Sequence, residues 1–210
     1  MCLGEHSGVR SCVEKDPLLT CSDLRAVFHM PKKLLIGLVV LLVAFVAIVT
    51  LQTGDFRVER STKIAAPAEA VFANVNDLHR WEARSPWAKM DPEAKLTYDG
   101  APTGVGAIYA WIGNSKVGEG KMTIIESTPS SLLKLRLDFL KPMAATNEAE
   151  FTFVTEGTET RVNWAMTGHK NFVSKAMCMV MSMDKMVGGE FEKGLAQLKA
   201  ITETEAMARK

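Results

Sequence analysis

The part of the chain after residue 54 is poor in cysteine and carries no excess of charge. Cys178 is its only cysteine, so this part has no internal disulfide and depends on a packed core for stability. Five of the 25 Lys and Arg residues and four of the 24 acidic residues precede residue 55, which leaves 20 of each in residues 55–210. Binding to nucleic acid requires a basic surface. We therefore expect no nucleic-acid partner, and the sequence identifies no protein partner.

Motifs for metal, phosphate and nucleophilic chemistry are also missing after residue 54. The histidines there, His79 and His169, lack the spacing to Cys, His or Asp that a zinc site needs. No glycine-rich loop joins a predicted strand to a helix, and no Gly-x-Ser-x-Gly motif is present. A surface position explains His79, and a solvated strand face explains Glu148 and Glu150, better than acid–base catalysis does. The sequence thus predicts no metal, no cofactor and no catalytic residue, and favours a protein that is not an enzyme.

Charged residues are missing from a long apolar run, residues 34–51, with the sequence LLIGLVVLLVAFVAIVTL. A helix of this length rises about 1.5 Å per residue and spans roughly 27 Å, close to the bilayer hydrocarbon core of about 30 Å. Lys32 and Lys33 precede the run, and Asp55 is the first charge after it. The positive-inside tendency places the N-terminus in the cytoplasm. We expect a single-pass protein of the cytoplasmic membrane, with a signal anchor at 31–53 and the C-terminal domain on the extracytoplasmic (periplasmic) side.

Two alternatives to the anchor fit the sequence less well. A cleaved signal peptide has an apolar region of about 7–15 residues and a small-x-small cleavage site, whereas this run is longer and its nearest site, AIV at 47–49, is poor. A buried helix of a soluble protein would show a polar stripe, which this run lacks. The segment MPKK at 30–33 has the form of an anchor's beginning. We expect residues 1–30 to be a disordered or mis-assigned N-terminal extension, with Met30 as the natural start and residues 1–29 as upstream sequence or a disordered cytoplasmic tail.

Residues 55–204 show the two-residue alternation of apolar and polar side chains that is typical of half-buried β-strands. In segment 132–140, for example, Leu133 and Leu135 alternate with Lys134 and Arg136. Turn residues separate successive strands, as in the segment GNS at 113–115, which indicates a hairpin. The predicted strands cover residues 56–64, 95–98, 106–112, 118–126, 132–140, 147–155 and 160–166.

Helical patterns follow the first strand and the last one. Pro67 suits the first turn of a short helix, and a second short helix is predicted at 77–81. A long helix is predicted from about residue 171 to residue 204, divided and expected to bend at Gly188-Gly189. An antiparallel sheet with one dry face needs a cover, and only this helix is long enough. We predict an α+β helix-grip fold at 55–204: a curved antiparallel sheet of about seven strands wrapped around a long C-terminal helix, preceded by one transmembrane helix and followed by a tail at 205–210.

Five segments carry a resemblance to a known family: IAAPAEAVF at 64–72, WEARSPW at 81–87, GVGA at 104–107, GEGKM at 118–122 and MVGGEFEKGL at 186–195. Together with the order of elements, they resemble the SRPBCC superfamily, which includes START lipid-transfer domains and polyketide cyclases. The chain is most similar to bacterial polyketide cyclase/dehydrase-like proteins with a membrane anchor, over about residues 55–203. The resemblance implies a cavity between sheet and helix. It implies function only weakly, because members include binders, carriers and cyclases.

Large apolar side chains are the candidate ligand contacts. Methionine is flexible and polarisable and suits a surface that adapts to several ligands, although ordinary core packing explains any single methionine better. Met177 and Met181 share one face of the predicted last helix. The candidate cavity residues are Trp81, Trp87, Tyr109, Trp111, Phe139, Phe151, Trp164, Met177 and Met181.

These features predict a membrane-tethered domain that binds a small hydrophobic ligand, such as a lipid or an isoprenoid-like molecule. One alternative is an enzyme of the cyclase or hydratase kind that uses an acid or base in the cavity. A second alternative is a protein-interaction or stress-response module whose cavity is filled by its own side chains. An ionisable group inside an accessible cavity would favour the enzyme, and a lining of Met, Phe and Trp alone would favour the binder.

Overall fold

The structure, a computed structural model, describes residues 32–179 and 182–208. The expectations for residues 1–30 concern a segment outside these ranges. The chain divides between Ile48 and Val49 into two units. The apolar run forms helix α2 (Lys32–Leu51), which is long and apolar enough to cross a membrane. A signal sequence near the N-terminus meets the same criterion of length and composition.

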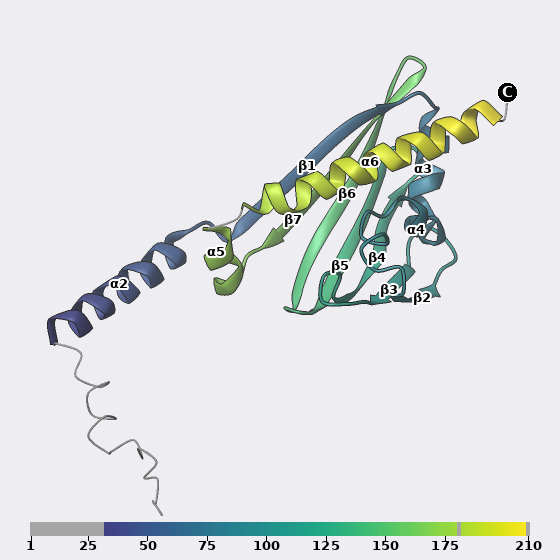
Figure 1. The fold of residues 1–210 in the computed structure, drawn as a ribbon. Coiled ribbons are helices and arrows are strands. Elements are labelled where there is room, and N and C mark those ends of the chain that lie inside the picture. Colours follow the sequence, from purple (N-terminus) through teal and green to yellow (C-terminus); the bar gives the residue numbers. More distant parts are fainter. Residues whose placement is uncertain (1–31, 180–181, 209–210) are drawn as a thin grey trace, which may run out of the picture. The chain divides into compact units, whose positions relative to one another are not determined.

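The second unit is built on one antiparallel sheet of seven strands, in the order β1-β7-β6-β5-β4-β3-β2. Strands β2 to β7 pair with their neighbours in the chain, and β1 pairs with β7. The long helix α6 lies across one face of the curved sheet, which confirms the predicted helix-grip fold (Figure 1). The strands are β1 (Asp55–Ile64), β2 (Lys95–Gly100), β3 (Ala107–Ile112), β4 (Glu119–Thr128), β5 (Leu132–Lys141), β6 (Ala145–Glu156) and β7 (Glu159–His169).

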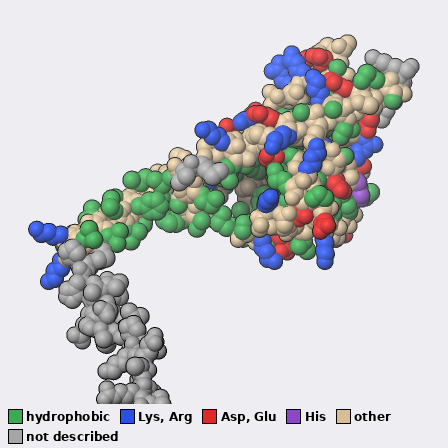
Figure 2. Space-filling model, in the orientation of Figure 1, with side chains coloured by type: hydrophobic (Ala, Val, Ile, Leu, Met, Phe, Trp, Pro, Cys, Tyr) green, Lys and Arg blue, Asp and Glu red, His purple; other side chains and the backbone are tan. Residues whose placement is uncertain are grey.

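Burial follows the alternation in the sequence. In β5, Leu133 and Leu135 point to the dry face of the sheet and are buried, whereas Arg136 points to the opposite face and is exposed. The dry face of the sheet packs against α6 through a continuous apolar core. On the face of the domain that Figure 2 shows, charged side chains of both signs are interspersed, in keeping with the equal numbers of acidic and basic residues in 55–210. The core residues contributed by α6 are Phe191, Leu195 and Leu198.

Three short helices connect β1 to β2: α3 (Ala68–Asn76), η1 (Leu78–Arg80) and α4 (Trp81–Arg84). Buried Arg84 joins them, because its guanidinium donates to the carbonyl oxygens of Asn74 and Val75 at the end of α3. The same guanidinium lies 4.7 Å from the ring centroid of Trp81. These contacts fix α4 beside the sheet, so that Trp81 reaches the interior.

The C-terminal helix is interrupted, which the sequence did not predict. It consists of α5 (Phe172–Cys178) and α6 (Met183–Ala208), and α6 extends beyond the expected end at residue 204. Ser182 precedes α6 and accepts hydrogen bonds from the backbone N–H of Lys185, on its carbonyl at 3.1 Å and its hydroxyl at 3.2 Å. Gly188 and Gly189, where we expected the division, lie inside α6. A Cβ atom at Gly188 would collide with the guanidinium of Arg60, so this glycine makes room for a neighbouring side chain.

Candidate ligand-binding cavity

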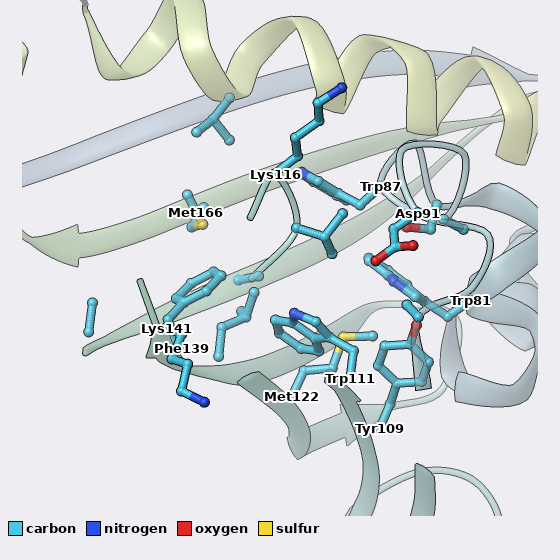
Figure 3. A pocket seen from close by; sticks show the side chains of 18 of the residues that line it. Trp81, Trp87, Asp91, Tyr109, Trp111, Lys116, Met122, Phe139, Lys141 and Met166 are labelled. Carbon is cyan, nitrogen blue, oxygen red and sulfur yellow. The ribbon is translucent and has the colours of Figure 1, made fainter. Parts of the chain in front are cut away.

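A cavity of about 430 Å³ lies within the second unit, between the sheet and the C-terminal helices. Strands β2 to β7 supply its floor, and α4, the start of α5, α6 and the loops after α4, β3 and β5 supply its walls (Figure 3). The lining is mainly apolar and aromatic. Besides the tryptophans and Tyr109, it includes Leu96, Met122, Leu135, Leu137, Met166, Val187 and Phe191.

Six of the nine predicted cavity residues line this cavity: Trp81, Trp87, Tyr109, Trp111, Phe139 and Trp164. Phe151 is buried behind Trp164, in a smaller void with Leu195 and Leu198. Met177 lies on α5 with about half of its surface exposed and is not among the lining residues. Met181 is outside the described residues. The structure thus brings the aromatic candidates of the sheet and α4 together, while Met177 lies elsewhere.

Stacked aromatic rings form the wall between the sheet and α6. The indole of Trp164 lies between Phe151, with ring centroids 4.8 Å apart, and Phe191 of α6, at 3.9 Å and an interplanar angle of 7°. Trp81 and Trp87 meet Trp164 edge-to-face at 5.7 and 6.2 Å. Offset-stacked and edge-to-face pairs are the favoured arrangements of aromatic rings, so this wall is pre-formed and stiff.

The loops at the rim of the cavity bring polar side chains that the sequence pattern did not identify. Asp91 joins two of these loops, because its carboxylate accepts hydrogen bonds from the N–H of Asn114 at 2.6 Å and of Glu93 at 3.3 Å. Lys141 pairs with Glu119 at 2.7 Å. Both lining residues therefore have structural partners. Strand alternation gives no signal for such loop positions, since they face the cavity only after the chain has folded.

Tyr109 is the buried ionisable side chain of the cavity, 6% exposed. Burial raises the pKa of its hydroxyl above the usual value for tyrosine. The group therefore stays neutral at physiological pH and can donate a hydrogen bond. Among the described residues, the hydroxyl has no hydrogen-bond partner. A ligand with an acceptor oxygen would supply one.

Two indole N–H groups of lining residues are also unpaired. Nε1 of Trp111 and Nε1 of Trp164 are buried and have no hydrogen-bond acceptor among the described residues. A buried donor without a partner costs about 1–3 kcal/mol. Together with Tyr109, these tryptophans place three unpaired donor groups among the residues that line the cavity.

The other side chains weighed for acid–base chemistry lie outside the cavity lining. His79 stacks on Tyr98, with ring centroids 4.4 Å apart, and its Nδ1 donates to the Asp77 carboxylate, 3.1 Å away. Glu148 and Glu150 are not among the lining residues. Within residues 32–179 and 182–208, no three His, Cys, Asp or Glu side chains lie close enough together to hold a metal ion. The cavity's own ionisable side chains are Tyr109 and, at the rim, Glu82, Asp91, Lys116 and Lys141.

A curved antiparallel sheet that holds a long helix over an internal cavity defines a helix-grip protein. Residues 55–203 match the family described as polyketide cyclase/dehydrase and lipid transport. The chain therefore belongs to this family, and the resemblance drawn from its sequence is confirmed. No curated protein matches the chain.

Several solved structures share the fold at low sequence identity. Norcoclaurine synthase from Thalictrum flavum, in complex with a transition-state analogue, is 14% identical with a TM-score of 0.55, covering 74% of this chain and 98% of that one. The di-domain ARO/CYC protein StfQ of the steffimycin biosynthetic pathway is 11% identical with a TM-score of 0.54, covering 73% and 52%. Protein CV1439 from Chromobacterium violaceum is 13% identical with a TM-score of 0.50, covering 71% and 98%. At such identities the likeness shows the fold alone.

Proposed function

We propose that this chain is a membrane-tethered domain that binds a small hydrophobic ligand, such as a lipid or an isoprenoid-like molecule, in the cavity between the sheet and α6. The observation that carries the proposal is the cavity itself, about 430 Å³ in volume and lined mainly by aromatic and aliphatic side chains. Small-molecule sites in proteins measure roughly 300–1,000 Å³ and are mostly apolar with a few polar groups. An open volume of this size favours a binder over a module whose cavity is filled.

The lining also indicates the kind of ligand. Burial of apolar surface contributes about 25 cal/mol per Å², so a hydrocarbon chain against these rings would supply most of the affinity. Tyr109, Trp111 and Trp164 offer donors and no charge. The ligand we propose is therefore apolar over most of its length and carries one or two uncharged oxygen atoms.

Tethering by α2 completes the proposal. An uncleaved α2 would hold the domain at the outer surface of the cytoplasmic membrane, where it would sample ligands of that membrane rather than diffuse. Cleavage of α2 as a signal peptide is the competing possibility. Sodium carbonate extraction of native membranes and the intact mass of the protein separate the two: a tethered protein stays in the membrane pellet and retains residues 32–51.

Native mass spectrometry of the detergent-extracted protein, with lipid analysis of what co-purifies, tests ligand binding. Ala145 is half-buried in the cavity lining, so Ala145→Trp should fill the cavity and lower the amount of bound lipid at least fivefold. Ala110→Trp is the matched control, because Ala110 is also half-buried but is not a lining residue. Its lipid content should equal that of the wild type.

Two results would refute the binder. In the first, nothing apolar travels with the wild type and no added lipid raises its melting temperature. In the second, Ala145→Trp keeps the full amount of bound lipid, which would place the lipid outside the cavity.

An enzyme of the cyclase kind is the second candidate. The observation that favours it is the buried, neutral Tyr109 hydroxyl, which is suited to donate a proton or a hydrogen bond to a carbonyl oxygen. Two proteins of the same fold are named as a norcoclaurine synthase and an ARO/CYC protein. Glu82 is the lining carboxylate whose charge acts on Tyr109, but among the described residues no hydrogen bond joins the two side chains, so binding is the stronger proposal.

A further inference from the structure

Helix α5 exposes an unusual amount of apolar surface. Phe172, Val173, Met177 and Met179 are 46%, 51%, 47% and 43% exposed, and no residue of α5 is buried. Residues 172–179 thus expose four large apolar side chains, three in α5 and Met179 directly after its end. Such a segment on a soluble domain marks a surface that contacts a membrane or a partner.

Charge distinguishes α5 from the rest of the domain. Lys170 and Lys175 are the charged residues between His169 and Met179, and no acidic residue lies there. On the face of the domain seen in Figure 2, side chains of both signs are mixed. Lysine beside exposed Phe, Val and Met is the composition of helices that lie in the headgroup region of anionic membranes.

The residues before α5 are hydrogen-bonded to Gly54 and Asp55, which follow α2 in the chain. The first residue of β1, Asp55, pairs with the last residue of β7, His169, with 3.0 Å between carboxylate and ring nitrogen. Lys170, the next residue, donates its N–H to the carbonyl of Gly54 at 2.7 Å. Leu51 ends α2 only three residues before Gly54, a stretch that spans at most roughly 10 Å. A bilayer crossed by α2 would therefore lie within reach of the first turn of α5.

The same helix reaches the cavity. Asn171 and Ser174 line it, and Asn171 begins α5 by accepting the N–H of Ser174 on its side chain at 2.8 Å. The segment 171–174 thus carries two cavity residues beside two exposed apolar ones, Phe172 and Val173. Helix α5 therefore lies between the cavity and the surface that its exposed apolar side chains contact.

We propose that α5 inserts Phe172, Val173 and Met177 into the surface of the anionic bilayer that holds α2, and so forms the passage between that bilayer and the cavity. The inference rests on the proposed function, in which α2 remains as an anchor and the ligand is a membrane lipid. Lys170 and Lys175 contact lipid phosphates, and the apolar side chains lie among the upper acyl chains. A ligand enters the cavity beside Asn171 and Ser174 without crossing water.

A matched pair of probe sites tests this docking in the full chain. With the four native cysteines replaced by serine, Val173→Cys and Val154→Cys each receive an environment-sensitive fluorophore. Val154 is a valine of similar exposure, 54% against 51%, but it pairs with Arg161 at the opposite end of β6 and β7 from His169. In vesicles of phosphatidylcholine and phosphatidylglycerol that contain nitroxide-labelled lipid, the probe at 173 should be quenched at least threefold more than the probe at 154. Equal quenching at both sites would overturn the proposal and leave the face of α5 for a protein partner.

Removal of the lysines adds a second readout. Lys170→Gln with Lys175→Gln should reduce quenching at position 173 in vesicles with phosphatidylglycerol and change little in pure phosphatidylcholine. If the double variant and the protein with both lysines are quenched equally in vesicles with phosphatidylglycerol, Lys170 and Lys175 do not contribute to membrane binding. Lipid that co-purifies in detergent reports separately on the cavity. A dye at 173 that is quenched while no lipid co-purifies would refute the proposed ligand but retain the docking helix.

Discussion

Arg60 of β1 forms a two-point ion pair with Asp184 in the first turn of α6. Its Nη1 and Nη2 donate to the two carboxylate oxygens at 2.8 and 2.9 Å, while its Nε donates to Glu192 at 2.7 Å. Bidentate arginine–carboxylate pairs are directional. The guanidinium therefore fixes both the position of α6 along β1 and the residue at which α6 begins.

This ion pair predicts a pH-dependent stability. The hydrogen bonds from Arg60 hold the pKa of Asp184 below its usual value. Because the folded pKa is lower than the unfolded one, the pair stabilises the fold above the unfolded value of about 4. The contribution is lost as the pH falls through the lowered pKa. We expect Asp184→Asn to lower the melting temperature at pH 7 and to match the wild type near pH 2.

Glu93→Gln serves as the control for this titration, since Glu93 is exposed and its carboxylate has no partner among the described residues. It should shift the melting temperature little at either pH. A deficit of Asp184→Asn that stays constant down to pH 2 would show that charge is not the source of the stabilisation.

The adjacent glycines of α6 should respond in opposite directions to alanine. A Cβ at Gly189 meets nothing within 4 Å, so Gly189→Ala should stabilise the helix by about 0.5–1 kcal/mol. A Cβ at Gly188 would displace the Arg60 guanidinium. Gly188→Ala should therefore be less stable than Gly189→Ala in denaturant unfolding. In an Arg60→Ala background, where the collision is gone, the two alanines should become equivalent, and a persisting difference would contradict this account.

Arg84 is expected to stabilise the helices that support the cavity. Burial lowers the pKa of its guanidinium to about 9, so it remains charged at neutral pH, and it donates to the carbonyls of Asn74 and Val75. Arg84→Met would leave both buried carbonyls unpaired, at a loss of about 2–4 kcal/mol in the free energy of unfolding. Arg57→Met is the matched control: the Arg57 side chain is 50% exposed, and its ion pair with Glu59 should contribute less than about 1 kcal/mol. Equal effects of the two substitutions would refute the role given to Arg84.

The strands could be predicted closely because alternation reports a local property, the face on which each side chain lies. Segment 132–140 differs from β5 by only one residue. The aromatic cavity residues of the strands could be predicted for the same reason, since Tyr109 and Trp164 occupy dry positions. The features that could not be predicted depend on contacts between residues far apart in the sequence. Gly188 indicates a bend locally, but its neighbour is Arg60, a residue more than a hundred positions earlier in the chain.

Two features could not be predicted from the sequence: the interruption of the C-terminal helix before Met183, and the polar side chains at the rim of the cavity. Residues 171–204 keep an apolar content suited to one helix, and nothing in their periodicity shows that α5 ends at Cys178. Asp91 lies in a loop, and its contact with Asn114 depends on two loops that meet only in the folded domain. Met177 was placed in the cavity by assuming one continuous helix, and the break leaves it on the exposed surface of α5.

Tyr109→Phe tests how the cavity recognises a polar atom of its ligand. The substitution removes only a hydroxyl that has no partner among the described residues, so stability should be unchanged or slightly higher. Farnesol and the hydrocarbon farnesene serve as matched probes, because they differ chiefly in a hydroxyl group. Loss of one hydrogen bond of about 1 kcal/mol should weaken farnesol binding roughly fivefold and leave farnesene binding unchanged.

The control for this substitution is Tyr98→Phe. Tyr98 neighbours Tyr109, with ring centroids 5.4 Å apart, but stacks on His79 and is not a lining residue. Its loss should alter neither affinity, which titration of detergent-solubilised protein would measure. Equal affinities of wild type and Tyr109→Phe for farnesol would mean that the hydroxyl does not contact the ligand. The unpaired Nε1 groups of Trp111 and Trp164 would then be the remaining donors within the described lining. If their replacement by phenylalanine also left the preference for farnesol unchanged, apolar burial alone would account for binding.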